Sequence, residues 1–195
     1  MSGPAPEPVR CWGASDELYA VYHDEEWGRP VRDERGLYER LCLEGFQSGL
    51  AWITVLRKRP RFREVFADFD PEVVATYGEK DVERLLQDPG IIRHRGKIEA
   101  TIANAKATVA LREAGRPLPE LMWSFAPAPR AEPPAAWADV PAQTPESQAL
   151  SKELRKAGFK FVGPTTVYAA MQACGLVDDH VDGCHVPVDG AGRRP

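Results

Sequence analysis

Apolar residues recur three and four positions apart through most of this chain, and no segment alternates between apolar and polar residues with a period of two. The first spacing is that of a helix face, whereas the second marks a strand. The sequence therefore predicts an all-α protein of about ten mostly short helices. The expected helices follow N-caps at Ser15 and Asp33, then cover about 50–58, 61–66, 71–77 (capped by Asp70), 81–87 and 96–114, and finally 145–158 (capped by Thr144) and 164–174. Arg59-Pro60 is expected to end one helix before the next begins.

The prolines predict one domain between two unstructured ends. Residues 1–9 hold three prolines and little to bury, so this tail is expected to be disordered, and residues 186–195 are expected to fray into a second disordered tail. The intervening residues, 10–185, are predicted to form a single domain. Within it, the proline-rich stretch 126–145 is expected to be an extended connector.

The segment 43–56 places charge in an apolar setting. Glu44 follows Leu37 and Leu41 at spacings of four and three, so it projects from the same helix face as these leucines. Trp52 follows, beyond two glycines that allow a bend or a close backbone approach. A flat ring beside a carboxylate suits a flat, cationic ligand that donates hydrogen bonds. The alternative is that Trp52 belongs to the core and Glu44 pairs with a buried arginine.

The overall charge and the lack of long apolar runs restrict the protein class. A net charge of −4 argues against a non-specific nucleic-acid binder, although basic clusters at 57–63 and 90–97 offer local positive surface or an ordinary solvated face. No apolar run approaches the roughly 20 residues that span a bilayer, and the first residues lack the apolar core of a signal peptide. We therefore expect a cytoplasmic protein whose cysteines pack, react or bind metal rather than form disulfides.

Cysteine and histidine residues lie at both ends of the predicted domain. Cys11 and His23 lie at its start, whereas His180 and Cys184, four apart and so on one face of an expected helix, lie at its end. Two thiolates and two imidazoles suit a closed, tetrahedral, structural zinc site. The spacing matches no compact zinc finger, and His185 could replace His180, so unliganded core cysteines and surface histidines remain the alternative.

The segment 158–165, Gly-Phe-Lys-Phe-Val-Gly-Pro-Thr, lies between two expected helices and resembles a helix-hairpin-helix element. Gly158 and Gly163 bound a turn that exposes backbone N–H groups where the second helix begins, near Thr165, and Lys160 adds positive charge. Such a hairpin grips a DNA backbone without reading its sequence. A corner that only packs two helices is the alternative.

A series of motifs follows one order along the chain. They are Arg-Cys-Trp at 10–12, Tyr-His-Asp-Glu-Glu-Trp-Gly at 22–28, Leu-Glu-Gly at 43–45, Gly-Leu-Ala-Trp-Ile-Thr-Val-Leu at 49–56, Gly-Ile-Ile-Arg-His-Arg-Gly-Lys-Ile at 90–98, Trp-Ser-Phe at 123–125, Gly-Phe-Lys-Phe-Val-Gly at 158–163 and Met-Gln-Ala-Cys-Gly-Leu-Val at 171–177. In this order they resemble DNA-3-methyladenine glycosylase I, a bacterial repair family of the helix-hairpin-helix superfamily. No single motif is decisive, whereas the ordered set is specific.

The resemblance implies a helix-hairpin-helix DNA glycosylase fold, with two helical lobes around a cleft and a structural zinc that ties the N- and C-terminal segments together. It implies a monomer that hydrolytically releases 3-methyladenine from alkylated double-stranded DNA and leaves an abasic site. Glu44 then matches the pocket carboxylate, Trp52 the ring that stacks on the base, and Tyr22 a polar wall. The implied zinc ligands are Cys11, His23, His180 and Cys184.

The chain departs from the family at three places. The segment between Cys11 and His23 is one residue shorter, which leaves open whether Trp12 lines the pocket. Phe46 stands where a glutamine is familiar, and Asp178 stands where the family usually shows asparagine. Many related glycosylases keep a catalytic aspartate near that position, but we expect Asp178 to cap a helix.

Two other functions fit parts of the sequence. A DNA-binding module without catalysis would use the hairpin and the zinc but has no reason to bury Glu44. A helical zinc protein that binds free purines has no use for the hairpin. For the enzyme itself, no lysine is placed for a Schiff base, so we expect hydrolysis without strand cleavage.

Overall fold

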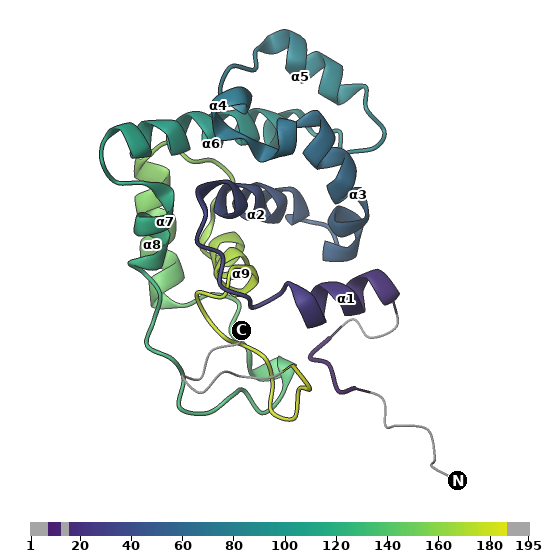
Figure 1. Cartoon of the computed structure of the whole chain (residues 1–195), viewed down its shortest axis with the longest axis vertical. Coiled ribbons are helices and arrows are strands. Elements are labelled where there is room, and N and C mark those ends of the chain that lie inside the picture. Colours follow the sequence, from purple (N-terminus) through teal and green to yellow (C-terminus); the bar gives the residue numbers. More distant parts are fainter. Residues whose placement is uncertain (1–7, 13–15, 187–195) are drawn as a thin grey trace.

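The computed structural model describes residues 8–12 and 16–186, and every regular element in these ranges is helical, which confirms the all-α prediction (Figure 1). Within them, no helix is both long and apolar enough to cross a membrane. The α-helices are α1 (Glu17–Glu25), α2 (Glu34–Gln47), α3 (Trp52–Val65), α4 (Pro71–Val74), α5 (Glu79–Leu86), α6 (Arg95–Glu113), α7 (Leu118–Trp123), α8 (Pro145–Lys156) and α9 (Pro164–Ala173). Two single 3₁₀ turns are η1 (Ala67–Phe69) and η2 (Trp137–Asp139).

Side-chain caps start several helices where the sequence predicts them. Asp33, Asp70 and Thr144 accept hydrogen bonds from backbone N–H groups two or three residues on, at the starts of α2, α4 and α8. Helix α1 is capped one residue later than predicted, because Asp16 accepts the hydrogen bond from the backbone of Tyr19. The predicted cap, Ser15, lies outside the described residues.

Helix α3 runs without a break through Pro60, so the predicted pair of helices at 50–58 and 61–66 is wrong. Proline lacks an N–H group and its ring crowds the preceding turn, which costs about 3 kcal/mol inside a helix. Burial of each large apolar side chain contributes roughly 1.5 to 3 kcal/mol. Packing on both sides of Pro60 outweighs its cost, because the helix buries Trp52, Val55, Leu56, Phe62 and Val65.

Three other elements differ from the prediction. Helix α4 ends at Val74 instead of near residue 77, and α7 had no sequence prediction. The expected helix carrying His180 and Cys184 is wrong, since residues 178–186 form a loop after α9. Gly183 adopts a left-handed backbone conformation in this loop, with φ of 74°, which turns the chain.

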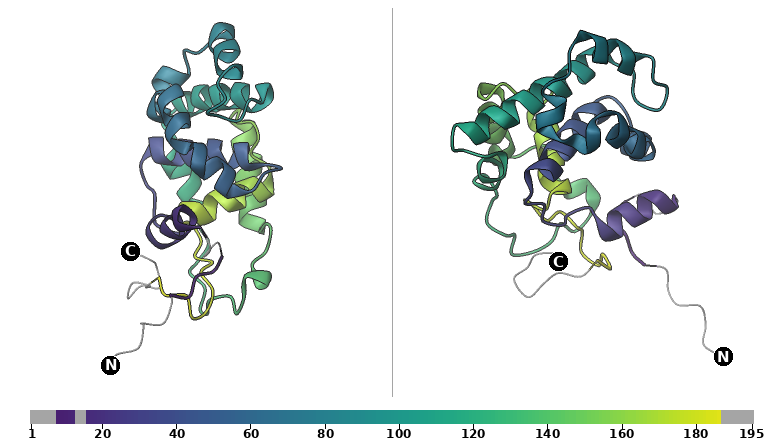
Figure 2. Two further views of the ribbon diagram at one scale, coloured as in Figure 1. Left: turned by 90° about the vertical axis from the view of Figure 1, so that its right-hand side faces the viewer. Right: turned by 45° about the horizontal axis from the view of Figure 1, so that its top comes forward.

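Helix α2 is the centre of the core and contacts α3, α6, α7 and α9. Figures 1 and 2 show it surrounded by these helices. Leu37 and Leu41 on its inner side have no exposed surface, and Glu44 shares their burial. The most central helix therefore carries a carboxylate into the interior, as the spacing of these residues predicts.

The start of the chain, the proline-rich stretch and the loop after α9 meet at one end of the molecule (Figure 1). Residues 126–144 contain no α-helix and only the single turn η2. The backbone N–H of Asp182 donates to the carbonyl of Pro134 at 2.8 Å, and that of His185 donates to the carbonyl of Val9 at 3.0 Å. Most of each predicted tail, residues 1–7 and 187–195, lies outside the described residues.

Candidate functional site

A cavity of about 180 Å³ opens between α1, α2, the start of α3, α9 and η2. Aromatic rings form most of its wall, and Glu44 with two glutamines supplies polar groups. Three residues predicted for the pocket, Tyr22, Glu44 and Trp52, line this cavity together, and so does Trp12, whose place the sequence leaves open. The complete lining is Trp12, Tyr19, Tyr22, Trp27, Glu44, Gln47, Trp52, Trp137, Ala169 and Gln172.

Glu44 is 5% exposed, yet no described residue forms a hydrogen bond or an ion pair with its carboxyl group. The alternative of a buried arginine partner is not what the structure has, because Arg40 is paired instead with Glu26, at 3.9 Å. Burial raises the pKa of Glu44 from 4.5 to about 8, and the charge of Arg40 only partly opposes this rise. The cavity therefore contains a carboxyl that protonates near neutral pH.

Aromatic rings surround this carboxyl on several sides. The ring centroids of Tyr22 and Trp52 are 5.4 Å apart, and the ring of Trp12 lies 6.0 Å from Tyr22 and 5.3 Å from Trp27. Burial and the nearby charge of Glu44 both raise the pKa of Tyr22 well above its usual value, so its hydroxyl stays neutral. The indole Nε1 of Trp52 is buried without a hydrogen-bond partner among the described residues. A flat molecule with hydrogen-bonding edges fits this environment.

Six residues of the wall were not predicted as site residues: Tyr19, Trp27, Gln47, Trp137, Ala169 and Gln172. Tyr19 and Trp27 belong to the aromatic side of α1, which is visible in the sequence. Trp137 comes from the proline-rich stretch, and Gln172 comes from a helix more than a hundred residues after Glu44. No local pattern marks these two, because tertiary packing alone brings them to the cavity.

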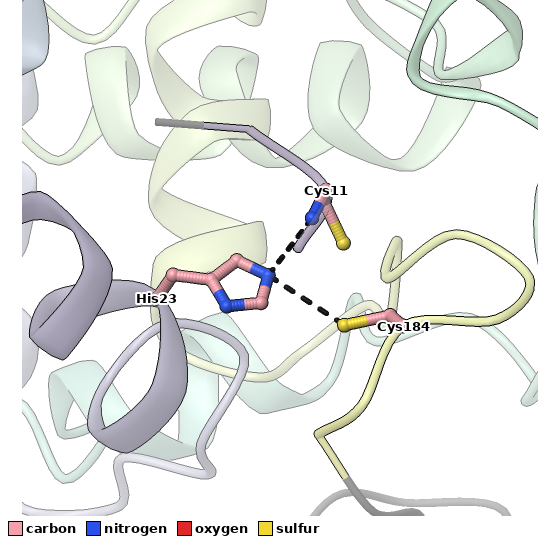
Figure 3. A group of neighbouring side chains, drawn as sticks. All are labelled: Cys11, His23 and Cys184. Carbon is pink, nitrogen blue, oxygen red and sulfur yellow. Dashed lines mark hydrogen bonds between the residues drawn. The ribbon is translucent and has the colours of Figure 1, made fainter. Parts of the chain in front are cut away.

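A second cluster joins the two ends of the chain. The ligand atoms of Cys11, His23 and Cys184 all lie within 4.8 Å of one another (Figure 3). The Nε2 atom of His23 lies 3.6 Å from the sulfur of Cys184 and 3.3 Å from the backbone nitrogen of Cys11. His180, the fourth predicted ligand, does not belong to this group, although its ring centroid lies 5.2 Å from that of His23. The structure thus brings three of the four predicted ligands together and leaves the fourth beside them.

Carboxylates orient both buried imidazoles. The Nδ1 atom of His23 lies 2.8 Å from Asp24, and Nδ1 of His180 lies 2.8 Å from Asp178, so each ring directs its Nε2 atom elsewhere. Burial would raise the pKa of Asp24, but hydrogen bonds from Arg10 and His23 lower it to about 2. Burial also lowers the pKa of His23, which favours the neutral imidazole that a metal requires.

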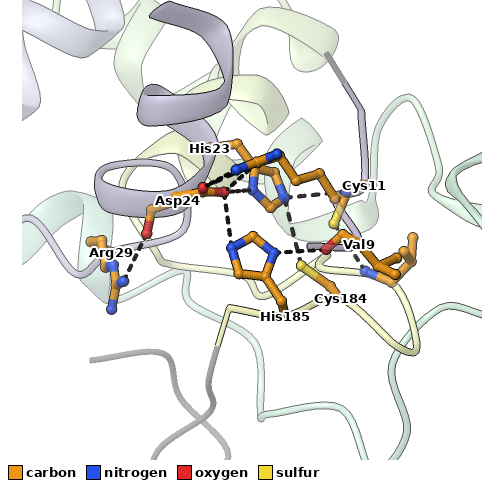
Figure 4. A network of polar contacts seen from close by, with 9 residues as sticks. Val9, Cys11, His23, Asp24, Arg29, Cys184 and His185 are labelled. Atoms are coloured by element: carbon orange, nitrogen blue, oxygen red, sulfur yellow. Dashed lines mark hydrogen bonds and ion pairs between the residues drawn. The ribbon is translucent and has the colours of Figure 1, made fainter. Parts of the chain in front are cut away.

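The other candidates near this junction have different partners. His185, the alternative ligand, is held by the carbonyl of Val9 at 2.8 Å and by Asp24 at 3.3 Å (Figure 4). Asp178 does not cap a helix, which corrects our expectation, because α9 ends at Ala173 and Asp178 lies in the loop beyond it. It accepts a hydrogen bond from the backbone of His180, and it does not line the aromatic cavity.

The turn between α8 and α9, predicted as a hairpin, is held by hydrogen bonds to α6. Asn104 of α6 accepts a hydrogen bond from the backbone N–H of Lys160 at 2.7 Å and donates one to its carbonyl at 3.2 Å. The N–H of Lys160 is therefore occupied within the protein, whereas the side chains of Lys160 and Thr165 are exposed. Gly163 is the N-cap of α9, and Gly158 has φ of 100°, so the two predicted glycines mark the bounds of the turn.

Basic residues of the 57–63 cluster are mostly neutralised by acidic neighbours. Arg57 pairs with Asp16, Arg59 with Glu26, Arg61 with Asp88 and Arg63 with Glu39. In the second basic stretch, the buried Lys97 donates to the carbonyls of Phe46 and Ser48 at 2.8 and 2.6 Å. Its ammonium group therefore secures the end of α2.

Comparisons with known proteins agree with this geometry. The methyladenine glycosylase family matches residues 12–187. The chain is 53% identical over 177 residues to DNA-3-methyladenine glycosylase 1 of Escherichia coli (strain K12), covering 90% of this chain and 95% of that protein. A crystal structure of 3-methyladenine DNA glycosylase I superposes with a TM-score of 0.88 at 52% identity, covering 91% of this chain and 98% of that one. The Staphylococcus aureus 3-methyladenine DNA glycosylase I, solved to explain 3-methyladenine recognition, gives a TM-score of 0.84 at 35% identity over 88% of this chain and 92% of that one. The chain belongs to the methyladenine glycosylase family.

Proposed function

We propose that this protein is a DNA glycosylase that hydrolyses the N-glycosidic bond of 3-methyladenine in alkylated double-stranded DNA, releasing the free base and leaving an abasic site. The substrate named for its relatives supports this assignment. The observation that carries it is Glu44, a buried carboxyl without a protein partner in an aromatic cavity. Such a group costs free energy in the folded protein, so its position requires a ligand that compensates for it.

The damaged nucleotide must leave the base stack before it can enter the cavity, which costs a few kcal/mol. Trp52 stacks on the extruded base, while Tyr22 and Trp12 enclose it from the side of α1. Contact between aromatic surfaces recovers part of the cost of extrusion, roughly 1 to 3 kcal/mol per stacked base. Removal of water from the cavity then strengthens each hydrogen bond to the polar edge of the base.

Glu44 is the residue that distinguishes an alkylated base from a normal one. Methylation at N3 makes the base in DNA a cation, so the leaving group needs no further proton and the enzyme needs little general acid catalysis. Because the pKa of Glu44 is about 8, its carboxyl is close to the point of ionisation in the free protein. A cationic base beside it favours the carboxylate, and a neutral base does not. The cavity therefore favours the alkylated form by charge as well as by shape.

The same carboxylate stabilises the positive charge that develops on the sugar as the glycosidic bond breaks, and water completes the hydrolysis. No strand-cleaving step is expected. The buried Lys97 is hydrogen-bonded to two backbone carbonyls and does not line the cavity, so it is not positioned to attack the sugar.

In this proposal, the hairpin at 158–165 binds the DNA backbone. Lys160 and Thr165 are exposed, and Gly163 begins α9, so the positive end of this helix dipole can meet a phosphate. A sequence-independent contact of this kind suits an enzyme that searches for damage rather than for a sequence. We propose that the enzyme acts as a monomer in the cytoplasm.

A structural zinc ion fits the donor set at the terminal junction. Cys11, His23 and Cys184 offer two thiolates and an imidazole within reach of one ion, and His180 is the fourth ligand that we propose. The carboxylates of Asp24 and Asp178 orient the imidazoles in the manner usual for zinc-bound histidines. The ion would hold the two ends of the chain together and take no part in base release.

One assay distinguishes this function from its rivals. The protein is incubated with methylated duplex DNA, and released bases are identified by chromatography. We expect free 3-methyladenine and an intact but abasic strand. Binding to DNA without base release would identify a binding module, and binding of free 3-methyladenine with no action on DNA would identify a purine-binding protein.

A further inference from the structure

Gln172 projects from α9 into the wall of the aromatic cavity, and its side-chain amide is held in one orientation. It is 8% exposed, and its Nε2 atom donates to Oδ2 of Asp179 at 2.8 Å. Because Oδ2 of Asp179 accepts this hydrogen bond, the amide nitrogen faces Asp179 and the amide oxygen faces away from it. A glutamine without this partner could turn either the oxygen or the nitrogen of its amide toward the cavity. The hydrogen bond to Asp179 fixes the orientation of the amide.

Asp179 is itself firmly held. It is 1% exposed, its Oδ2 accepts a hydrogen bond from the hydroxyl of Tyr168 at 2.5 Å, and its Oδ1 lies 2.8 Å from the guanidinium of Arg130. Arg130 belongs to the proline-rich stretch, so this stretch places a positive charge beside the aspartate. A buried, paired carboxylate with three partners is a rigid anchor for the glutamine.

The oxygen of the Gln172 amide is available to a ligand. No described residue donates a hydrogen bond to Oε1. Oε1 is not one of the fully buried atoms that have no partner, so part of its surface is accessible. The open space that Gln172 lines is the aromatic cavity. The cavity wall therefore presents a hydrogen-bond acceptor whose orientation is determined by residues behind it.

We propose that Gln172 recognises the substrate by accepting a hydrogen bond from the exocyclic amine of 3-methyladenine, and that Asp179 is the positioning residue that makes Gln172 an acceptor. The inference rests on the proposed function, because it takes the aromatic cavity as the base-binding site. It assigns to the cavity a preference for 6-amino purines over 6-oxo purines. A 6-oxo purine such as 3-methylguanine would place its own acceptor against the amide oxygen.

Glu44 alone provides weaker discrimination between these two bases. Since its pKa is about 8, its carboxyl can accept a hydrogen bond when ionised and donate one when protonated near neutral pH. The amide of Gln172 has no such freedom while Asp179 holds its nitrogen. An amino group carries two N–H bonds, so Glu44 and Gln172 can each accept one of them.

The test compares the affinities of free 3-methyladenine and free 3-methylguanine, measured by titration calorimetry. Gln172→Met keeps the length of the side chain and removes the acceptor, so we expect 3-methyladenine binding to weaken about three- to tenfold, with no loss for 3-methylguanine. Asp179→Asn lets the amide turn round, so the preference for 3-methyladenine should shrink by a similar factor. In the double variant, Asp179→Asn should change the preference no further, because its effect passes through Gln172.

Two controls separate recognition from folding. Tyr168→Phe removes another hydrogen bond to Asp179 but leaves the bond to Gln172, so it should lower the melting temperature and keep the preference. Zinc content is measured for each variant because Asp179 precedes His180. If Asp179→Asn does not fold, hydrogen exchange of the side-chain amide protons of Gln172 is measured by NMR in the wild-type protein. Their signals are identified by their loss in Gln172→Met. Slow exchange supports the positioning role of Asp179, and fast exchange overturns it.

The outcomes distinguish this inference from the proposed function. If Glu44→Gln weakens binding while Gln172→Met keeps the full preference for 3-methyladenine, the cavity binds the base and Gln172 does not recognise it. If Asp179→Asn lowers the preference further in the Gln172→Met background, Asp179 does not act through Gln172. If Glu44→Gln also binds both bases as the wild type does, the cavity itself is not the binding site.

Discussion

The aromatic cavity and the terminal junction both bury polar side chains, but the carboxyl groups at the two places have different surroundings. In the cavity, the carboxyl of Glu44 and the indole nitrogen of Trp52 have no partner among the described residues. At the junction, Asp24 is bonded by both Arg10 and His23, and the second nitrogen of His23 lies beside a cysteine sulfur. In both regions, burial of these polar groups costs desolvation free energy.

The ligands that we propose for the two regions account for this difference, because a base is bound and released whereas a structural metal stays bound. A site that binds a base and releases it must be stable while empty, so it bears the cost of a few unpaired groups in order to bind only the right ligand. A structural metal site stays filled, so its surrounding carboxylates and imidazoles can be arranged around a permanent charge. The buried carboxyl of Glu44 and the buried indole nitrogen of Trp52 therefore support our proposal that the cavity recognises the substrate, whereas the pairing of Asp24 with His23 suits the structural role that we propose for the junction.

The largest expected effect comes from breaking the junction. Cys184→Ala should release the metal and lower the melting temperature by about 10 °C or more, because a structural zinc contributes its binding free energy to folding. Metal analysis and thermal melting check this. Cys42→Ala, which removes a buried thiol far from the junction, is the matched control and should keep the metal. Absence of zinc from wild-type protein purified without chelator would contradict the assignment.

Replacing the buried carboxyl of Glu44 with an amide should stabilise the free protein, by an amount that depends on pH. Because burial raises the pKa of Glu44 from 4.5 to about 8, the folded state holds a proton that the unfolded state loses between these values. The contribution of Glu44 to the unfolding free energy is therefore full below pH 4.5, declines as pH rises, and is lost above pH 8. Glu44→Gln should be more stable than the wild type above pH 8, by on the order of a few kcal/mol.

Denaturant unfolding from pH 5 to 9 measures this effect. Glu25→Gln, at an exposed position of α1, provides the baseline for losing a carboxylate at the surface. A difference between Glu44→Gln and wild type that stays constant with pH would show that Glu44 is not held protonated by burial.

The same substitution should impair catalysis. Charged hydrogen bonds contribute roughly 1.5 to 3 kcal/mol, so we expect Glu44→Gln to slow single-turnover release of 3-methyladenine by about ten- to a hundredfold. Glu44→Ala should be slower still, because it also leaves a void beside Trp52. Asp178→Asn should release the base at nearly the wild-type rate, since its carboxylate contacts His180 and not the cavity. A folded Glu44→Gln with undiminished release, beside an inactive Asp178→Asn, would transfer the catalytic role to the aspartate.

The smallest effect is expected at the hairpin, outside both regions. Gly163→Asp should weaken binding to damaged and undamaged DNA alike, by about three- to tenfold, because a carboxylate there repels phosphate. The fold should tolerate it, since Gly163 is an N-cap with φ of −64° and a Cβ atom there would meet only the end of Arg155, at 3.7 Å. Gly163→Asn has the same shape without the charge and should bind normally. An equal loss of affinity for free 3-methyladenine would instead connect the hairpin with the cavity.

Local chemistry made much of the fold predictable. Asp33, Asp70 and Thr144 start their helices as expected because a cap is an interaction between residues two or three positions apart. The same local rules failed at Pro60, where packing of apolar side chains before and after the proline outweighs its cost. They failed again for His180 and Cys184, because a spacing of four residues indicates one helix face only if a helix is present.

Within the cavity, the sequence by itself determined the burial of Glu44, since its spacing from Leu37 and Leu41 places all three on one face of α2. Only the tertiary structure decided which groups line the cavity together with that carboxyl. Gln172 and Asp179 lie seven residues apart, yet their contact depends on the loop after α9 and on a counter-charge from the proline-rich stretch. Periodicity records which residues share an element, because that relation is local. The meeting of separate elements depends on packing of the whole chain, and no stretch of sequence contains that information by itself.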